Sequence, residues 1–281
     1  MHQRYIVTEK ASSPPAPSGV TIRSVPRLTE IGGRRAPFLR WSVWRMALGL
    51  RRMTSEGQVG DGREAALAEY VIANARAGDL DAAIRAVDEF CYQRSAMMNV
   101  GDEKGEILDA AIRRVRPRRL LELGTYCGYS ALRTARAMPD GARLVSVEFN
   151  PANAEIARTI LAHAGAADAV TVVDGSLGDD GVTSAALERD HGLAAGTLDF
   201  VFLDHDKSAY LPDLERIVER GWLHAGAVVV ADNVKVPGAP RYRRYMRDHE
   251  GRDWRTTEHS THVEYQALLS DLVLESEYLG A

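Results

Sequence analysis

The feature that most constrains the fold is a regular alternation of short apolar runs with stretches of helical periodicity, which fills the C-terminal part of this 281-residue chain. Short apolar runs rich in Val, Leu and Phe are typical of buried strands, and apolar residues that recur at helical spacing are typical of helices. The expected strands are 120–123, 144–148, 170–173, 198–203 and 227–231. Such alternation predicts a parallel sheet joined by right-handed crossovers.

Further elements are expected on both sides of this core. Two more strands, 260–268 and 272–278, have no long helix between them, so they predict a hairpin that places an antiparallel strand in the sheet. The helices expected before the sheet are 62–78, one that begins near Asp79, and 107–115 after a polar loop at 98–105. The prediction is an α/β fold: a mostly parallel seven-stranded sheet with helices on both faces and a C-terminal antiparallel hairpin.

The first part of the chain differs in composition from the rest. Residues 1–53 carry nine Arg and one Lys against two Glu, a net charge of +8, and the segment 12–19 is rich in Pro and Ser. Sequence of this kind does not form regular structure. We therefore expect 1–55 to be a basic, disordered arm and 56–281 to be the globular domain.

Two interpretations of this arm stay open. In the first it is a disordered extension, or sequence that precedes the true start at Met46 or Met53. In the second its positive charge, with Trp41 and Trp44, makes a weak contact with a membrane surface. The apolar residues of the arm do not fall on one clean helical face, which argues against the second.

Composition narrows the class of protein. The hydrophobic content of 45% and the charged content of 26% are ordinary for a soluble globular protein, and a net charge of −4 gives no reason to expect nucleic-acid binding. No apolar stretch approaches the roughly 20 residues that span a bilayer, so we expect no transmembrane segment. Only two cysteines, Cys91 and Cys127, are present, which favours a reducing, cytoplasmic location over a disulfide scaffold.

Polar residues stand where three of the expected strands end. Glu122 lies in the first run, Asp204 follows the fourth, and Asp232 and Asn233 follow the fifth. In open α/β sheets, ligands bind outside the carboxyl ends of the strands, so we expect these side chains to converge on one site. Two carboxylates and an amide oxygen are hard ligands that suit Mg²⁺ rather than zinc. The alternative is that Asp232 and Asn233 only cap a turn.

Lys207 lies three residues after Asp204 and can point into the same cleft. A lysine beside a divalent cation can serve as a general base. The alternative is an ordinary solvated lysine. The sequence alone leaves both interpretations open.

The turn at 120–130 indicates a second ligand. Gly124 and Gly128 allow a tight bend and a close approach of backbone N–H groups to a polar group. Glu148, at the end of the next strand, is placed to accept the hydroxyls of a ribose. The strict G-x-G-x-x-G pattern is absent, so a dinucleotide is not favoured and a nucleoside cofactor is expected.

Five segments together resemble the catechol O-methyltransferase family. They are MNVGDEKG at 98–105, LELGTYCGYSALR at 121–133, FLDHDK at 202–207, ADNVKVPGAP at 231–240 and VEYQ at 263–266. Their order and spacing agree with the family from about residue 60 to the C-terminus, which is far more specific than any single motif. The resemblance implies a Rossmann-like class I methyltransferase fold, S-adenosylmethionine as methyl donor, and Mg²⁺.

The resemblance also implies site residues at matching positions. Lys207 would be the general base on one catechol hydroxyl, and Glu264 would hydrogen-bond the other. The metal would be bound by Asp204, Asp232 and Asn233. The residues implied for the cofactor are Met98, Val100, Glu122, Gly124, Tyr126, Ser130, Glu148, Phe149, Ser176, Asp204 and His205, and those implied for the substrate are Lys207, Asn233, Pro237 and Glu264.

Three positions depart from the family. Asp206 stands where the animal enzyme has a Trp against the adenine, and Ala96 stands where it has a Trp beside the catechol. The loop at 175–178, which carries Ser176, matches less closely. The substrate pocket is therefore expected to be wider than in the animal enzyme.

Four functions remain open. The first is Mg²⁺-dependent methyl transfer from S-adenosylmethionine to one hydroxyl of a catechol-type small molecule. The second is methyl transfer to a larger metabolite with vicinal hydroxyls, which Ala96 permits. The third is a catalytically silent cofactor-binding protein, against which the intact Lys207 and Glu264 argue. The fourth is an NAD-linked dehydrogenase, against which the absent glycine motif argues.

Overall fold

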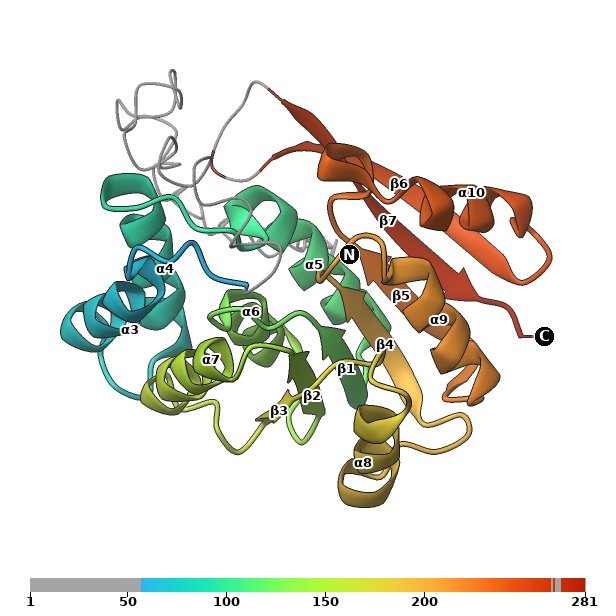
Figure 1. The fold of residues 1–281 in the computed structure, drawn as a ribbon, viewed down its shortest axis with the longest axis horizontal. Helices are drawn as coiled ribbons and strands as arrows, with labels where there is room; N and C mark the ends of the chain where they lie inside the picture. Colours follow the sequence, from blue (N-terminus) through green and yellow to red (C-terminus); the bar gives the residue numbers. More distant parts are fainter. Residues whose placement is uncertain (1–56, 264, 266–268, 281) are drawn as a thin grey trace, which may run out of the picture. The chain divides into compact units, whose positions relative to one another are not determined.

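The computed structural model describes residues 57–263, 265 and 269–280, so the predicted arm at 1–55 lies outside the described residues. The described residues form a seven-stranded sheet with the strand order β3-β2-β1-β4-β5-β7-β6 (Figure 1). The strands are β1 (Arg119–Leu123), β2 (Arg143–Glu148), β3 (Val170–Asp174), β4 (Leu198–Leu203), β5 (Leu223–Ala231), β6 (Trp254–His262) and β7 (Ser270–Tyr278).

The sheet has a parallel part and an antiparallel part. β1 pairs in parallel with β2 and β4, and the same direction continues from β2 to β3 and from β4 to β5. β7 pairs antiparallel with β5, and β6 pairs antiparallel with β7. The predicted mostly parallel sheet with a C-terminal antiparallel hairpin is thereby confirmed.

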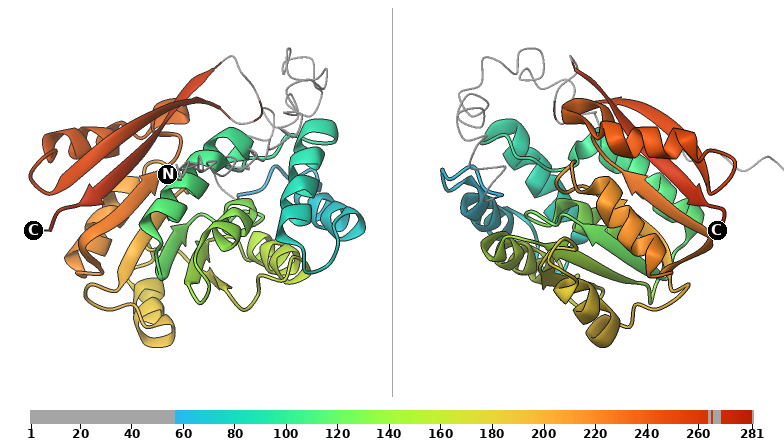
Figure 2. Two further views of the ribbon diagram at one scale, coloured as in Figure 1. Left: turned by 180° about the vertical axis from the view of Figure 1, so that it is seen from behind. Right: turned by 45° about the vertical axis from the view of Figure 1, so that its right-hand side comes forward.

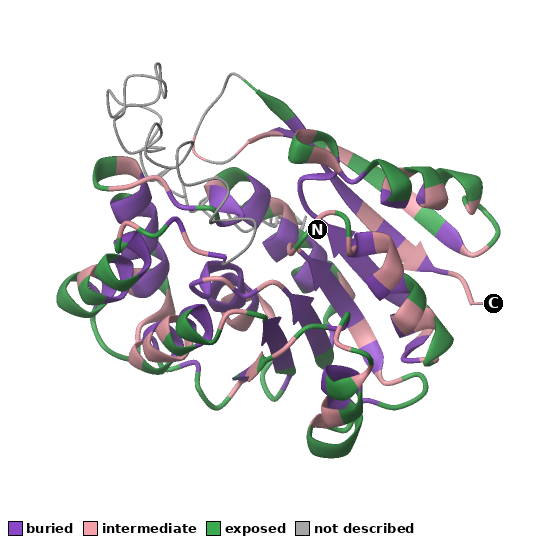
Figure 3. Cartoon of the chain, in the orientation of Figure 1, coloured by how far each residue is buried: buried purple, intermediate pink, exposed green. Residues whose placement is uncertain are grey.

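Helices cover both faces of the sheet (Figure 2). Because side chains alternate along a strand, Leu120 and Phe202 pack with the helices that precede β3 on one face, while Leu121 and Leu203 pack with the α-helices that follow β3 on the other. The central strands are buried almost throughout (Figure 3). The helices are α3 (Arg63–Asn74), α4 (Leu80–Gln93), α5 (Gly101–Val115), α6 (Tyr129–Ala137), α7 (Pro151–His163), α8 (Val182–His191), α9 (Tyr210–Glu219) and α10 (Pro240–Asp248). None of the helices in the described part of the chain has the length and apolar character that crossing a bilayer requires.

The predicted polar loop at 98–105 is wrong over its second half, because α5 begins at Gly101. The Asn99 side-chain oxygen accepts a hydrogen bond from the Gly101 N–H (3.0 Å), and two carboxylates in the first turn interact favourably with the helix dipole. Gly105 is typical of a loop but serves close packing, since a Cβ there would lie 2.3 Å from the Arg133 guanidinium.

The predicted strand at 260–268 is wrong in position, because β6 starts at Trp254 and ends at His262, which pairs with Ser270. β6 is an edge strand, so polar side chains are accommodated on its exposed positions. The apolar residues that led to the prediction fall beyond the strand, where Tyr265 has a φ of 54°, outside the extended range.

Candidate active site

Three strand ends lie side by side at the carboxyl edge of the sheet. β4 lies between β1 and β5, with Leu203 paired to Leu123 on one side and to Ala231 on the other. The N–H of Asp204 donates to the Leu123 carbonyl (2.9 Å), and the N–H of Asp232 donates to the Leu203 carbonyl (3.0 Å). This register brings the two aspartates to neighbouring positions.

Glu122 in β1 is a buried carboxyl group with one oxygen that lacks a partner. The Ser130 hydroxyl donates to its Oε1, whereas Oε2 has no hydrogen-bond partner among the described residues. Burial raises the pKa of Glu122 to about 8. A buried acceptor without a partner favours a ligand that brings an N–H group or a positive charge.

The turn after β1 brings the backbone close to the end of β4. Gly124 has a φ of 99°, and a Cβ there would lie 2.5 Å from the Asp204 carbonyl oxygen, so a side chain does not fit. The N–H of Tyr126 donates to Glu148 Oε2 (2.8 Å), and the N–H of Asn150 donates to Oε1 (3.0 Å). Burial raises the pKa of Glu148, whose carboxylate is held at the rim of the turn.

Glu64 in α3 lies outside the set predicted from the sequence. Its Oε1 accepts hydrogen bonds from the Tyr126 hydroxyl (2.9 Å) and from the Val59 N–H (3.0 Å). The Glu64 side chain is buried, so this contact fixes the Tyr126 ring against the turn. In the sequence Glu64 is only a polar residue in a helical pattern, and nothing there signals the contact.

Lys207 is held by two hydrogen bonds where the chain leaves β4. Its Nζ donates to Asp204 Oδ1 (2.9 Å) and to the Tyr210 hydroxyl (2.6 Å). That hydroxyl donates in turn to the Leu203 carbonyl (2.7 Å). The Lys207 side chain is only 16% exposed, so it lies against Asp204 rather than in solvent.

Asp232 and Asn233 follow β5 and are both buried. Asp232 accepts from the Asn233 N–H at Oδ1 (2.7 Å), and its Oδ2 lies 2.9 Å from Lys104 Nζ. The Asn233 side-chain nitrogen donates to the Val236 carbonyl (3.0 Å) and to Asp271 Oδ2 (2.7 Å). A turn cap accounts for the first contact, but not for those with Lys104 and Asp271, which come from α5 and from β7.

Other predicted cofactor residues surround this edge. His205 Nε2 lies 2.8 Å from Asp213 Oδ2, so the ring is held at the start of the segment after β4. Val100 is buried immediately before α5, whereas Met98 and Phe149 are exposed, with 42% and 52% of their surface accessible. The two exposed apolar side chains are available to cover a ligand.

Of the remaining predicted residues, the structure describes Ser176 and Pro237 but not Glu264. The Ser176 hydroxyl accepts from the Gly178 N–H (3.0 Å), a contact within the loop after β3. Pro237 is exposed in the turn after β5. Glu264, implied as a partner of the second catechol hydroxyl, lies outside the described residues.

Comparisons with known proteins agree with this geometry. A model of the O-methyltransferase family matches residues 76–241, and the chain is 61% identical over 235 residues to the probable O-methyltransferase Rv1703c of Mycobacterium tuberculosis, across 84% of this chain and 100% of that relative. The chain belongs to the O-methyltransferase family. Within the family it is 43% identical over 214 residues to catechol O-methyltransferase B of Danio rerio, across 76% of this chain and 78% of that relative.

Solved O-methyltransferases have the same fold. The O-methyltransferase TomG of Streptomyces achromogenes, solved in complex with S-adenosylmethionine, superposes with a TM-score of 0.57 at 23% identity, across 86% of this chain and 100% of that chain. This likeness confirms the predicted Rossmann-like methyltransferase fold. With the family match, the chain is an O-methyltransferase with this fold.

The residues at the candidate site fit S-adenosylmethionine, the methyl donor that the family resemblance implies. The unpartnered Oε2 of Glu122 suits the ammonium of an amino-acid moiety, and the absence of a side chain at Gly124 keeps the turn open beside it. Of the described residues, no three His, Cys, Asp or Glu side chains form a group that could hold a metal. A metal here would therefore depend on two carboxylates, Asp204 and Asp232, with the Asn233 amide, all hard oxygen donors of the kind that suit Mg²⁺.

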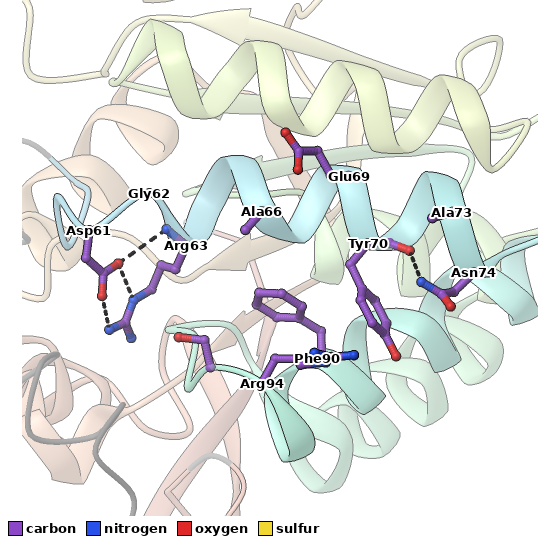
Figure 4. A pocket seen from close by; sticks show the side chains of 11 residues that line it. Asp61, Gly62, Arg63, Ala66, Glu69, Tyr70, Ala73, Asn74, Phe90 and Arg94 are labelled. Carbon is purple, nitrogen blue, oxygen red and sulfur yellow. Dashed lines mark hydrogen bonds and ion pairs between the residues drawn. The ribbon is translucent and has the colours of Figure 1, made fainter.

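A separate hollow of about 550 Å³ lies between α3 and α4 (Figure 4). Asp61 and Arg63 form an ion pair (2.7 Å) at one end, and the rings of Tyr70 and Phe90 lie 5.5 Å apart along its wall. None of the site residues predicted from the sequence lines this hollow. The hollow is therefore separate from the candidate site at the sheet edge.

Asp271 is a residue of the candidate site that the strand-end pattern does not predict. That pattern points to acidic residues at the carboxyl ends of strands, but Asp271 stands at the amino end of β7. Because β7 runs antiparallel to β5, its amino end lies at the carboxyl edge of the parallel strands. In the sequence, an acidic residue directly before the last strand of a predicted antiparallel hairpin is thus the pattern that indicates a site residue such as Asp271.

Proposed function

We propose that the protein transfers the methyl group of S-adenosylmethionine to one hydroxyl of a catechol-type small molecule, with Mg²⁺ bound by Asp204, Asp232 and Asn233. The observation that carries the proposal is Lys207 Nζ, 2.9 Å from Asp204 Oδ1 at the strand end next to Asp232. A base beside a set of hard oxygen donors would suit a substrate with two adjacent hydroxyls, since the donors could hold a metal that favours the ionised form of a hydroxyl and the base could take its proton. The likeness to the catechol O-methyltransferase of Danio rerio supports the same substrate class.

The proposed mechanism depends on where the proton goes. When bound, Mg²⁺ favours the ionised form of a hydroxyl that it contacts, and S-adenosylmethionine supplies the methyl carbon. Lys207, as a neutral amine, takes the proton of the reacting hydroxyl, so an O–H bond breaks and an N–H bond forms. The oxygen then bonds to the methyl carbon, and the electron pair of the breaking carbon–sulfur bond stays on sulfur.

The surroundings of Lys207 set its position for this transfer. Asp204 and the Tyr210 hydroxyl hold Nζ from two sides, and both belong to elements fixed by the sheet. Because the attack joins opposite charges, a preorganised site that excludes water contributes through positioning and electrostatics. The complete burial of the Asp232 side chain is consistent with such a site.

A larger substrate with vicinal hydroxyls is the second candidate. Ala96, which the family resemblance places beside the substrate, offers only a methyl group, and Met98, two residues later, is exposed. The Ala96 carbonyl accepts a hydrogen bond from Arg63, which holds this segment in place. A short side chain at position 96 favours extra room next to the proposed diphenol position.

A methyl-transfer assay tests both candidates. Purified full-length protein is incubated with S-adenosylmethionine and catechol, in Mg²⁺ and in EDTA, and the methylated product is measured by mass spectrometry. We expect transfer in Mg²⁺ only, with no methylation of phenol, the matched substrate with one hydroxyl. Full turnover in EDTA would overturn the metal assignment. Turnover of bulky vicinal diols but not of catechol would favour the second candidate, and cofactor binding without any transfer would show a silent binding protein.

A further inference from the structure

A fully buried lysine lies behind the proposed metal ligands. The Lys104 side chain in α5 is 0% exposed, and its Nζ lies 2.9 Å from Asp232 Oδ2 and 3.2 Å from Asp271 Oδ2. Both aspartate side chains are also 0% exposed. Buried charges of this kind are costly unless they are paired, and a buried ion pair is weak evidence for added stability. Its position therefore calls for another explanation.

Both carboxylate oxygens of Asp271 accept hydrogen bonds from the segment that carries Asn233. Its Oδ2 accepts from the Asn233 side-chain nitrogen (2.7 Å) and from Lys104 (3.2 Å). Its Oδ1 accepts from the Val236 N–H (3.0 Å). One carboxylate at the start of β7 thus holds both the side chain of Asn233 and the backbone that follows it.

These contacts set the orientation of the Asn233 amide. Its nitrogen donates to Asp271 and to the Val236 carbonyl, so its oxygen is directed to the opposite side of the amide group. Asn233 has a φ of 53°, in the left-handed region that asparagine adopts more readily than most residues with a side chain. The contacts with Asp271 then fix the side chain on this backbone.

The Asp232 carboxylate is also contacted at each of its two oxygens. Its Oδ1 accepts from the Asn233 N–H (2.7 Å), and Lys104 contacts Oδ2 (2.9 Å). The Asn233 N–H therefore fixes Oδ1 by a hydrogen bond, whereas Lys104 pairs with Oδ2 by charge, without the geometry of a hydrogen bond. Lys104 links Asp232 to Asp271, so the orientations of Asp232 and Asn233 depend on one ion-pair network.

We propose that Lys104 and Asp271 are positioning residues for the metal: they hold Asp232 and Asn233 in the orientation that binds a divalent cation. This inference rests on the proposed function, because it takes Asp232 and Asn233 to be ligands. Partners that orient metal ligands through hydrogen bonds commonly change metal affinity by about 10- to 100-fold when they are replaced.

Two variants separate positioning from simple packing. Asp271→Asn keeps the shape of the side chain, but an amide accepts on one side only, so it cannot satisfy both the Val236 N–H and the pair of donors at Oδ2. Lys104→Met removes the charge and keeps much of the volume. Asp109→Asn is the matched control, since Asp109 is a buried partner of Arg133 (2.9 Å) on the same helix α5.

Binding of Mn²⁺ to full-length protein, followed by electron paramagnetic resonance, measures metal affinity without turnover. We expect Asp271→Asn and Lys104→Met to weaken Mn²⁺ binding by about 10- to 100-fold. Affinity for S-adenosylmethionine, measured by calorimetry without metal, should be retained. In turnover, the Mg²⁺ concentration for half-maximal rate should rise in both variants, with much of kcat recovered at high Mg²⁺. The Asp109→Asn control should lower the thermal midpoint and leave Mn²⁺ affinity unchanged.

Other outcomes would contradict the positioning role, the metal assignment or both. Mn²⁺ affinity equal to that of the wild type in a folded Asp271→Asn variant would refute the positioning role and leave the proposed function standing. An equal loss of affinity in Asp109→Asn, or failure of both network variants to fold, would show a structural role only. A wild-type protein that turns over catechol without binding Mn²⁺ or Mg²⁺ would overturn the metal assignment itself, and the inference with it.

Discussion

The Tyr210 hydroxyl accepts a hydrogen bond from Lys207 Nζ at 2.6 Å and donates one to the Leu203 carbonyl at 2.7 Å, so the last residue of β4 fixes the proposed base. A lysine side chain carries about 2 kcal/mol of rotamer entropy, which a rigid partner removes before substrate arrives. Tyr210 is completely buried at the start of α9, and it provides that rigidity.

Loss of this anchor should lower turnover without unfolding the protein. We expect Tyr210→Phe to reduce kcat by up to about 10-fold, since a typical hydrogen bond contributes about 0.5–1.5 kcal/mol and about 1.4 kcal/mol corresponds to a factor of ten in rate. Steady-state kinetics at saturating Mg²⁺ and S-adenosylmethionine provide the measurement. Tyr242→Phe is the control, because Tyr242 is a buried tyrosine whose ring lies against Tyr210 (5.7 Å). A kcat that is equal in the two variants would contradict the anchoring role.

Removal of the base itself should have a larger effect. We expect Lys207→Ala to lower kcat by at least about 10²-fold, the lower end for loss of a general base. The pH–rate profile of the wild type should contain one ionisation that the variant lacks. Calorimetric affinity for S-adenosylmethionine should be retained, which would exclude a general collapse of the site. If kcat is unchanged where chemistry limits the rate, Lys207 is not the base.

Asp204→Ala should abolish methyl transfer while cofactor binding largely survives. The reason is that its carboxylate is proposed to serve the metal and also contacts Lys207, whereas its backbone carbonyl packs against Gly124 and is unaffected by the change. Turnover with excess Mg²⁺ and calorimetric titration of S-adenosylmethionine separate the two effects. Retention of wild-type activity by this variant would remove Asp204 from both roles.

Glu122 should give the cofactor-free protein a pH-dependent stability. Its pKa is about 8 in the fold against an ordinary value of 4.5, so the folded state binds this proton more tightly than the unfolded chain does. Its contribution to the free energy of unfolding is fully present below pH 4.5 and is lost as the pH rises to 8. We expect Glu122→Gln, which cannot ionise, to raise the thermal midpoint at pH 8 and not at pH 4.5.

The same substitution should weaken S-adenosylmethionine binding, because glutamine offers no negative charge to the ammonium of the cofactor. Melting curves at the two pH values, with and without S-adenosylmethionine, measure both effects. Equal midpoints of the wild type and Glu122→Gln at pH 8 would show that burial does not penalise the charged carboxylate.

Removal of residues 1–53 should leave turnover and the thermal midpoint unchanged. The segment is basic and partly rich in Pro and Ser, a composition that does not supply a packed core. If the arm contacts a membrane surface, its net charge of +8 should bind anionic vesicles at low salt and lose that attraction at high salt. Pelleting of full-length and truncated protein with such vesicles is the measurement. A large fall in the midpoint would show that the arm packs on the fold.

The strands and their edge could be predicted from the sequence because the signal is local. Each buried parallel strand is a continuous apolar run, and the residue that ends the run is necessarily at the edge of the sheet. Asp204 and Asp232 were therefore recognisable as neighbours, and β4 and β5 pair as expected. The edge strand β6 was misplaced because its polar residues carry no such signal.

The supporting contacts could not be predicted, because they join distant parts of the chain. Lys104 and Asp271 are 167 positions apart, and Glu64 and Tyr126 are 62 apart. Each pair forms only after the helices pack on the sheet, so no spacing rule applies. Lys104 was also concealed by two glycines that favoured a loop where α5 begins.

Because Gly124 has no side chain, the turn after β1 lies directly against the end of β4. The Asp204 carbonyl occupies the space that a Cβ would need, so any side chain there would push the end of β4 away from β1. The turn proposed to bind the methyl donor and the strand that leads to the proposed base are therefore held at one spacing, which any side chain at position 124 would disturb. Changes of substrate range are expected instead at peripheral positions such as Ala96 and Pro237, where a new side chain leaves the distance between donor and base unaltered.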